Sequence, residues 1–186
     1  MIISLIGFMA AGKTTMGSQL AQSLRCEFLD LDQYIEEKEG KTIAEIFAEN
    51  SEAHFRKLEE QYLEDILEAH IADHPETLED LPPRNQDSSA QDGMLPERSC
   101  TLVISVGGGC VMSELCSELL DRFTYCIYLE SDFHTLFARL NQSEELDKRP
   151  LASEAANSSK MKEHLEKIFR QREPHYRKLA RKTIRF

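Results

Sequence analysis

The sequence predicts a three-layer α/β/α fold, in which helices cover both faces of a five-stranded parallel sheet. Short apolar stretches alternate with amphipathic stretches of helical period, and the connections are long enough to cross over a sheet. Residues 101–106 form a nearly continuous apolar run, which is typical of a strand buried on both faces. The 186 residues, 41% of them hydrophobic, have room for a single domain spanning residues 1–186 with a substantial core.

The first expected strand, residues 2–6, leads directly into a glycine-rich loop and then a helix. The loop reads Gly7-Phe8-Met9-Ala10-Ala11-Gly12-Lys13-Thr14, which is the spacing G-x-x-x-x-G-K-[ST] of a phosphate-binding P-loop. Backbone N–H groups and the helix dipole at such a junction attract phosphate. We expect Lys13 to reach the β and γ phosphates, Thr14 to offer its hydroxyl to Mg²⁺, and Thr15 to add a hydroxyl. The predicted fold is therefore of the P-loop kinase type.

Ala10 stands where loops of this kind often carry a third glycine. A methyl group is tolerated at this position only if the residue keeps a negative φ. Ala10 is therefore a departure from the usual loop pattern.

A second strand is expected at residues 27–31, and it brings two carboxylates to the carboxyl edge of the sheet. Asp30 and Asp32 are two residues apart and so can face the same side of a strand, where ligands of open α/β sheets bind. Beside a P-loop, they suggest binding of a metal ion and a hydroxyl group. The alternative is that both acids cap the helix expected at residues 33–39.

Two further helices are expected, and the resemblance described below implies that about residues 32–62 are the substrate-binding region. Thr42-Ile43-Ala44-Glu45 is a capping box that opens one helix, and Ser51 starts a longer helix that reaches about residue 72. Arg56 and Glu59 lie three residues apart on that helix, where a weak surface ion pair is the usual interpretation. His70 and His74 have no third ligand in view, so we expect no metal site there.

Residues 73–99 differ in composition from the rest of the chain. They hold four of the six prolines and no aromatic residue, and their seven acids against two arginines contribute a net −5 to the total of −11. Such a segment buries too little apolar surface to offset the entropy of ordering. We expect a mobile acidic insertion.

The second half of the chain repeats the strand and helix alternation. Gly107-Gly108-Gly109 follows the buried strand and lets a ligand approach the backbone closely, unless it is only a flexible turn. Ser113 is expected to cap one helix, and Ser131 a second one that follows a strand at residues 124–129 and carries Arg139 near its end.

The last part of the chain is expected to hold a lid, a helix and an edge strand. Residues 141–160 have few large apolar side chains and contain Lys148-Arg149-Pro150, as expected for a lid over a nucleotide. Met161 is expected to begin the final helix, which Pro174 should kink or end. A fifth strand is expected at residues 182–186.

Composition limits the function classes. The net charge of −11 argues against nucleic acid and anionic membranes as partners, because both need a basic surface. The five cysteines form no C-x-x-C pair, there is no secretory or membrane-length apolar segment, and Met1 opens directly into the first strand. We expect a reduced cytoplasmic protein that is a monomer and has no cleaved leader.

Several motifs occur in an order that resembles the shikimate kinase family of P-loop small-metabolite kinases. They cover most of the chain outside residues 73–99, and the series is far more specific than a P-loop alone. The motifs are residues 7–17, Asp30-Leu31-Asp32, Gly40-Lys41-Thr42-Ile43, Ile46-Phe47, Phe55-Arg56-Lys57-Leu58-Glu59, Ser105-Val106-Gly107-Gly108-Gly109, Arg149-Pro150-Leu151 and Arg172-Glu173-Pro174-His175-Tyr176.

The resemblance implies transfer of the γ-phosphoryl group of ATP to the 3-hydroxyl of shikimate, with Mg²⁺ as cofactor. It implies that Lys13, Asp32 and Arg149 are catalytic, and that Thr14, together with Asp30 through water, holds Mg²⁺. It also implies an ATP site and a shikimate site, made of Gly12, Lys13, Thr14, Thr15, Met16, Gly17, Arg139 and Arg149 for ATP, and Asp32, Arg56, Gly107, Gly108, Gly109 and Arg172 for shikimate.

The chemistry of shikimate agrees with these roles. A ring with one carboxylate and three hydroxyls needs guanidinium donors at one end and an acceptor at the other. Arg56 and Arg172 supply the donors, Asp32 supplies the acceptor, and Glu59 is then expected to orient Arg56.

The sequence also departs from the family pattern. Ser51 replaces a glycine, and relatives generally continue past the fifth strand into an adenine-covering loop and a last helix, whereas this sequence stops at Phe186. We therefore expect adenine contacts from that region to be missing or replaced and nucleotide affinity to be weaker. Two alternatives stay open: another small-metabolite kinase, such as one for gluconate, and a non-catalytic nucleotide-binding relative.

Overall fold

The computed structural model describes residues 1–78, 99–142 and 158–186. Most of the predicted acidic insertion and most of the predicted lid, including Arg149, lie outside the described residues. In chain order the elements are β1 (Ile2–Ile6), α1 (Lys13–Leu24), β2 (Glu27–Asp30), α2 (Leu31–Glu39), α3 (Ile43–Glu49), α4 (Glu52–Asp73), η1 (Pro75–Leu78), β3 (Leu102–Ser105), η2 (Cys110–Met112), α5 (Glu114–Phe123), β4 (Thr124–Glu130), α6 (Phe133–Gln142), α8 (Ser158–Leu179) and β5 (Lys182–Arg185).

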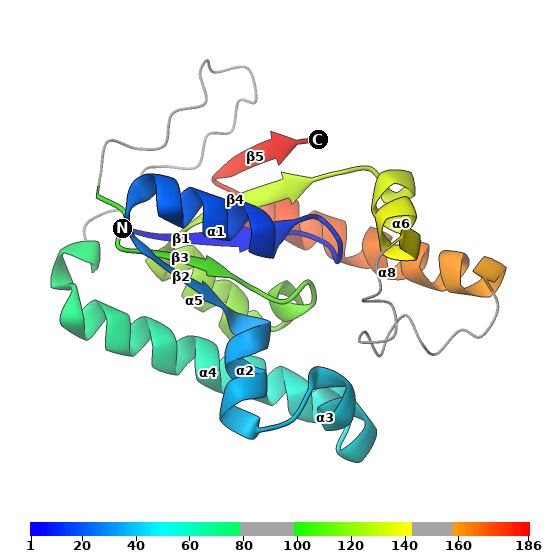
Figure 1. Cartoon of the computed structure of the whole chain (residues 1–186), viewed down its shortest axis with the longest axis horizontal. Coiled ribbons are helices and arrows are strands. Elements are labelled where there is room, and N and C mark those ends of the chain that lie inside the picture. The colour runs from blue at the N-terminus through cyan, green and yellow to red at the C-terminus, as the bar shows by residue number, and fades with distance from the viewer. Residues whose placement is uncertain (79–98, 143–157) are drawn as a thin grey trace.

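The predicted five-stranded parallel sheet is confirmed. Its strand order is β2-β3-β1-β4-β5, and every neighbouring pair is parallel. All residues of β1 and β3 are buried, because α1 covers one face of the sheet while α5 and α8 cover the other (Figure 1). The sheet therefore supplies a rigid platform, and all its strands end at the same side.

The helices α2, α3 and α4 form a group beside β2, which is an edge strand of the sheet (Figure 1). The expected capping residues begin two of them, since Thr42 and Glu45 form a capping box and the Ser51 hydroxyl accepts a hydrogen bond from His54 N. α4 ends at Asp73, and η1 follows it, so the first residues assigned to the acidic insertion are helical. This group presents Asp32 and Arg56 toward the strand ends.

The starts of two helices differ from those expected at Ser131 and Met161. Asp132, and not Ser131, caps α6, because its carboxylate accepts from Thr135 N at 3.0 Å while the Ser131 hydroxyl is buried without a hydrogen-bond partner. α8 starts at Ser158 and continues through Pro174 to Leu179. Burial of Tyr176 and Leu179 against the sheet holds the helix together beyond the proline, so tertiary packing outweighs the lost backbone hydrogen bond.

None of the helices in the described part of the chain combines the length and apolar character needed to cross a membrane.

Candidate active site

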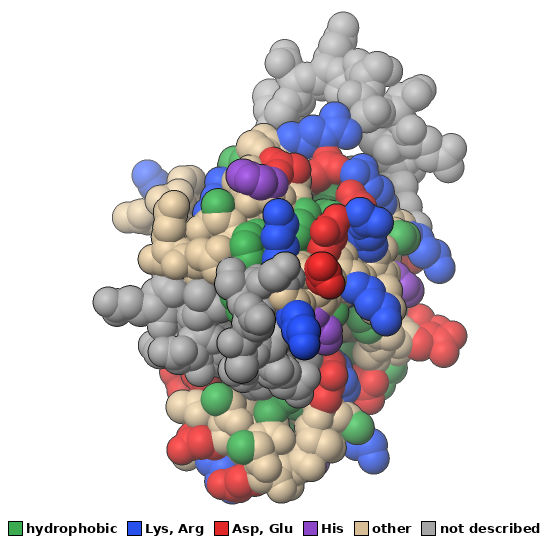
Figure 2. Space-filling view, turned by 90° about the vertical axis from the view of Figure 1, so that its right-hand side faces the viewer, with side chains coloured by type: hydrophobic (Ala, Val, Ile, Leu, Met, Phe, Trp, Pro, Cys, Tyr) green, Lys and Arg blue, Asp and Glu red, His purple; other side chains and the backbone are tan. Residues whose placement is uncertain are grey.

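A pocket of about 480 Å³ opens at the carboxyl ends of β1, β2 and β3. The P-loop, the start of α2, the start of α4, the Gly107–Gly109 turn and α8 all contribute to its lining. Figure 2 looks from the side toward which the strand arrows of Figure 1 point, and there basic and acidic side chains lie intermixed. The parallel sheet thus brings segments from both halves of the sequence to one site.

The P-loop has the backbone conformation that phosphate binding requires. Gly7 has φ 150° and Gly12 has φ 85°, values that favour glycine. Lys13 begins α1 and its ammonium donates to the carbonyl oxygens of Gly7 and Phe8 at 3.0 and 3.1 Å. The charge is therefore held over the loop, where it can meet a phosphate oxygen.

Ala10 does not keep the negative φ that would suit its methyl group. Its φ is 59°, in the left-handed region, although it carries a methyl group. The turn between Gly7 and Gly12 needs this conformation, and the hydrogen bond from Ala11 N to Phe8 O at 3.2 Å closes it. The loop geometry therefore takes precedence over the local preference of alanine.

Asp30 has the capping role that the sequence left open, and it also contacts the P-loop threonine. Its Oδ1 accepts from the backbone N of Asp32 and Gln33, which caps α2, while its Oδ2 accepts from Thr14 Oγ1 at 2.6 Å. The pair of oxygen donors suits Mg²⁺, which prefers oxygen and is often held by one or two protein ligands plus phosphates. Within the described residues, no group of three or more His, Cys, Asp or Glu side chains could hold a metal by itself.

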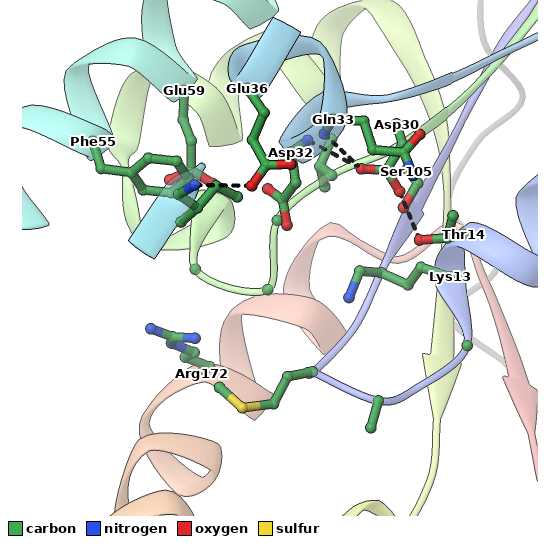
Figure 3. A pocket seen from close by; sticks show the side chains of 18 of the residues that line it. Lys13, Thr14, Asp30, Asp32, Gln33, Glu36, Phe55, Glu59, Ser105 and Arg172 are labelled. Carbon is green, nitrogen blue, oxygen red and sulfur yellow. Dashed lines mark hydrogen bonds between the residues drawn. The ribbon is translucent and has the colours of Figure 1, made fainter. Parts of the chain in front are cut away.

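Asp32 lies in the first turn of α2, one residue beyond the end of the strand predicted for it. In Figure 3 its carboxylate points into the pocket, with Lys13 on one side and Arg172 on another. Asp32 therefore lies beside the P-loop, as predicted, but it is positioned by the start of α2 and not by a strand.

Arg56 and Glu59 form an ion pair that is not a surface pair. The Glu59 side chain is 1% exposed and bonds to Arg56 Nη1, while Glu52 binds Arg56 Nη2 at 2.8 Å. Burial raises the pKa of Glu59 to about 7, against the opposing effect of the Arg56 charge. Burial also lowers the pKa of Arg56, but the charges and hydrogen bonds of Glu59 and Glu52 outweigh it and raise the pKa above its usual value. Arg56 is therefore a fixed cation on the pocket wall.

The three consecutive glycines leave room for these charged groups. A Cβ on Gly107 would stand 2.8 Å from Asp32 Oδ1 and closer still to Glu59 Oε1. A Cβ on Gly109 would stand 2.5 Å from Cζ of Arg56. The turn is thus more than a flexible connection, because it is the surface against which two carboxylates and a guanidinium pack.

Arg172 reaches the same pocket from α8 and is only 6% exposed. Burial lowers its pKa, and the positive charge of Arg56 lowers it further. One turn later, the buried Tyr176 hydroxyl donates to Gly108 O, which ties α8 to the glycine turn. Two guanidinium groups in one partly desolvated site offer donors that suit a carboxylate ligand.

Most of the predicted site residues line this pocket, and a few do not. Gly12, Lys13, Thr14, Thr15, Asp30, Asp32, Arg56, the three glycines, Arg139 and Arg172 line it. Met16 and Gly17 are absent from the lining. Gly17 is buried where a Cβ would collide with the Phe28 ring, so it serves the packing of α1 on the sheet.

Two residues without a role in the sequence analysis complete the site. Glu36 lies one helical turn after Asp32, lines the pocket, and accepts from Ile43 N at 2.8 Å, which joins α2 to α3. Glu36 could have been found in the sequence from its spacing of four residues from Asp32. Apart from its place in a motif, nothing in the sequence indicated a role for Tyr176, because its hydrogen bond to Gly108 joins residues far apart in the chain.

Comparison with protein families gives a match to the family profile "Shikimate kinase" over residues 9–74 and 84–185. The chain is similar to shikimate kinase of Chloroherpeton thalassium, with 34% identity over 179 residues that cover 94% of this chain and 78% of the relative. It is also similar to shikimate kinase of Dictyoglomus turgidum, with 31% identity and coverage of 96% and 83%.

Solved structures give the same result. Shikimate kinase from Acinetobacter baumannii in complex with shikimate superposes with a TM-score of 0.74 at 30% identity, covering 98% of this chain and 82% of that one. Shikimate kinase from Bacteroides thetaiotaomicron superposes with a TM-score of 0.74 at 28% identity, covering 99% and 85%.

Proposed function

This chain belongs to the shikimate kinase family, and we propose that its pocket phosphorylates the 3-hydroxyl of shikimate with ATP as the phosphoryl donor. The observation that carries this proposal is the convergence of Arg56, Arg172 and Asp32 on the glycine turn, next to a P-loop. The sequence predicts that the enzyme works in the cytoplasm as a monomer within aromatic amino acid biosynthesis.

The two arginines are proposed to bind the shikimate carboxylate. Both are held by the fold before any ligand arrives, Arg56 by Glu52 and Glu59 and Arg172 by burial on α8. Burial lowers the pKa of Arg172, and repulsion by the Arg56 charge lowers it further. An anion bound between the two guanidinium groups would reduce this repulsion. A ligand with a carboxylate therefore gains more here than a neutral sugar would.

The P-loop is proposed to bind the ATP phosphates, through Gly12, Lys13, Thr14 and Thr15. Thr14 and Asp30 would hold Mg²⁺, which when bound supplies positive charge to the phosphate oxygens. Arg139 lines the same pocket and is proposed to lie against adenine, while the proposed lid residue Arg149 is outside the described residues.

Asp32 is proposed to orient the ring hydroxyl and to accept its proton. In-line phosphoryl transfer passes through a loose transition state, so positioning and cations contribute more than a strong base. A strong base is then not needed, and the Asp32 carboxylate is sufficient. Lys13 would stabilise the charge that develops on the transferred group.

A coupled assay for ADP formation tests the proposal, run with shikimate, with gluconate and with no acceptor. Of the three assays, we expect only the one that contains shikimate to form ADP.

Arg56→Ala should lower kcat/KM for shikimate by about 30- to 1,000-fold, which corresponds to roughly 2–4 kcal/mol, with KM for ATP little changed. Arg170→Ala is the matched control, because Arg170 is on α8, 75% exposed and paired only with Glu166 among the described residues.

The possible outcomes distinguish the loss of a substrate contact from damage to the fold. Arg56→Ala leaves Glu59 buried without its strongest partner, so Arg56→Lys is measured beside it, since it keeps the charge and loses only the planar fork. An equal loss for ATP and shikimate in both variants would mean that the fold had been damaged. Turnover of gluconate but not shikimate would refute the proposed substrate.

A further inference from the structure

Two cysteines that are distant in the chain lie side by side at the end of the sheet opposite the pocket. Cys26 precedes β2 and Cys100 precedes β3, and their Sγ atoms are 3.4 Å apart although 74 residues separate them. Both are half-buried, so they are partly open to solvent. Because β2 and β3 are parallel, this end holds their starts, while the pocket lies where the strands finish.

The strand pairing holds the two cysteines next to each other. Glu27 pairs with Leu102 in the sheet, and Glu27 N donates to Thr101 O at 3.3 Å. Cys26 and Cys100 stand one and two residues before this pair. Their Sγ atoms, 3.4 Å apart, need to approach to about 2.05 Å to form the bond.

We propose that Cys26 and Cys100 form a reversible disulfide when the protein meets a small-molecule disulfide such as glutathione disulfide. The Cys26 thiolate attacks one sulfur of that molecule, which breaks its S–S bond and releases one glutathione thiolate. The Cys100 thiolate then attacks Sγ of Cys26 and releases the second. Two protein thiols lose two electrons, glutathione disulfide gains them, and the two thiol protons pass to the released thiolates.

The surroundings set the order of attack. Burial, together with the hydrogen bond from Cys26, raises the pKa of the Cys100 thiol to about 12. Cys100 is therefore a poor first nucleophile, whereas the glutathionylated Cys26 would present a disulfide sulfur directly beside it. Cys110, Cys116 and Cys126 are buried and are shielded from the oxidant.

The link would close a loop that contains α2, α3 and α4, the elements that carry Asp32 and Arg56. Crosslinking a loop of this length restricts the unfolded chain far more than the folded one, so it should stabilise the fold. Since the link lies at the opposite end of the strands from the pocket, the kinase rate should change by less than about twofold.

The test exposes the full-length reduced protein to glutathione disulfide, then alkylates free thiols and measures intact mass. We expect the loss of two of the five thiols, no retained glutathione, and a crosslink between the tryptic peptides 26–38 and 99–122. Fragmentation of the second peptide distinguishes Cys100 from Cys110 and Cys116. The Tm should rise by about 5–10 °C and return after reduction.

Single variants test the order of the steps. Cys100→Ser should stop at a stable glutathione adduct on Cys26, and Cys26→Ser should leave Cys100 as a thiol. The double variant should show no Tm change with the oxidant, and reduced forms of all variants should keep the Tm of the parent within about 3 °C. A parent protein that retains both thiols, that keeps a glutathione adduct, or that links Cys26 to another cysteine would overturn the proposal.

Discussion

Glu59 shows at the scale of one residue how the fold sets the chemistry of the pocket. Its carboxylate is 1% exposed, is bonded to Arg56, and lies near Asp32 across the Gly107 backbone. Burial raises its pKa to about 7, Arg56 opposes this rise, and the negative charge of Asp32 adds to it. A carboxyl group with a pKa of about 7 beside Arg56 links protonation to stability.

The first prediction concerns the pH dependence of this group. The folded pKa is about 7 and the ordinary value is 4.5, so the folded protein holds the proton more tightly than the unfolded chain. The stabilising contribution is complete below pH 4.5 and is lost as the pH rises through 7. Relative to Glu59→Gln, the free energy of unfolding of the parent should therefore fall over this window by up to about 3 kcal/mol.

Urea unfolding of both proteins at a series of pH values measures this difference. Glu68→Gln is the matched control, since Glu68 is exposed on the same helix. A difference between Glu59→Gln and the parent that stays constant from pH 4.5 to 7.5 would contradict the prediction.

A second residue-scale prediction follows from the backbone of Ala10. A methyl-bearing residue at φ 59° is strained, so Ala10→Gly should raise the free energy of unfolding by about 0.5–1 kcal/mol. Ala11→Gly, which removes a buried methyl at a residue without positive φ, should lower it instead. Thermal or urea unfolding of the two variants decides the matter, and a loss of stability in Ala10→Gly would show that the strain is absent.

At the scale of elements, the Gly107–Gly109 turn and α8 act as one unit. Tyr176 on α8 bonds to Gly108 O, Arg172 reaches the pocket from the same helix, and Arg56 packs against Gly109. Cys110 continues the turn directly into η2, whose buried side chains fix it to the core. The geometry of the proposed carboxylate site therefore depends on the relative positions of α8, the Gly107–Gly109 turn and α4.

The third prediction displaces one member of this unit. A Cβ on Gly109 would stand 2.5 Å from Cζ of Arg56, so Gly109→Ala should move the guanidinium and lower kcat/KM for shikimate by about ten- to a hundredfold. Gly40→Ala is the control, because it strains a left-handed residue in open space outside the pocket and should cost stability only. Steady-state kinetics with each substrate varied in turn are the measurement, and an unchanged shikimate KM and kcat in Gly109→Ala would contradict it.

At the scale of the whole molecule, the pocket differs in charge balance from the chain. The chain carries a net charge of −11, whereas four cations, Lys13, Arg56, Arg139 and Arg172, line the pocket beside four carboxylates. The net negative charge disfavours nucleic acid, while the pocket cations can bind small anions. The pocket joins β1, β2, β3 and α8, so ligands should stabilise the entire fold and not one part of it.

The fourth prediction uses this coupling. A non-hydrolysable ATP analogue with Mg²⁺, at about 100 times its Kd, should stabilise the protein by about 2.7 kcal/mol and raise Tm by about 5–10 °C. Shikimate should also raise Tm when it is added without the nucleotide. Lys13→Ala should lose most of the nucleotide effect and keep the shikimate effect, as measured by differential scanning calorimetry. If the analogue shifted both proteins equally, Lys13 would have no part in phosphate binding.

Much of the fold was predictable because its signals are local. The P-loop spacing, the alternation of strands and helices, the capping box at Thr42 and the edge strand at the end of the chain each depend on a few adjacent residues, and the structure confirms them. One capping prediction was wrong, because Asp132 and not Ser131 caps α6. Ala10 and Pro174 occupy positions that run against their local preference, Ala10 in the left-handed turn of the P-loop and Pro174 inside a continuous helix.

The sequence by itself therefore determined the order of the elements, the parallel sheet and the residue types that meet at its carboxyl edge. Only the tertiary structure decided that Glu59 is buried beside Arg56 and Asp32, that Tyr176 holds Gly108, and that Cys26 touches Cys100. The physical reason is that periodicity and motif spacing act over a few residues along the chain. Burial and the distance between side chains depend instead on segments that the sheet brings together from far apart in the sequence.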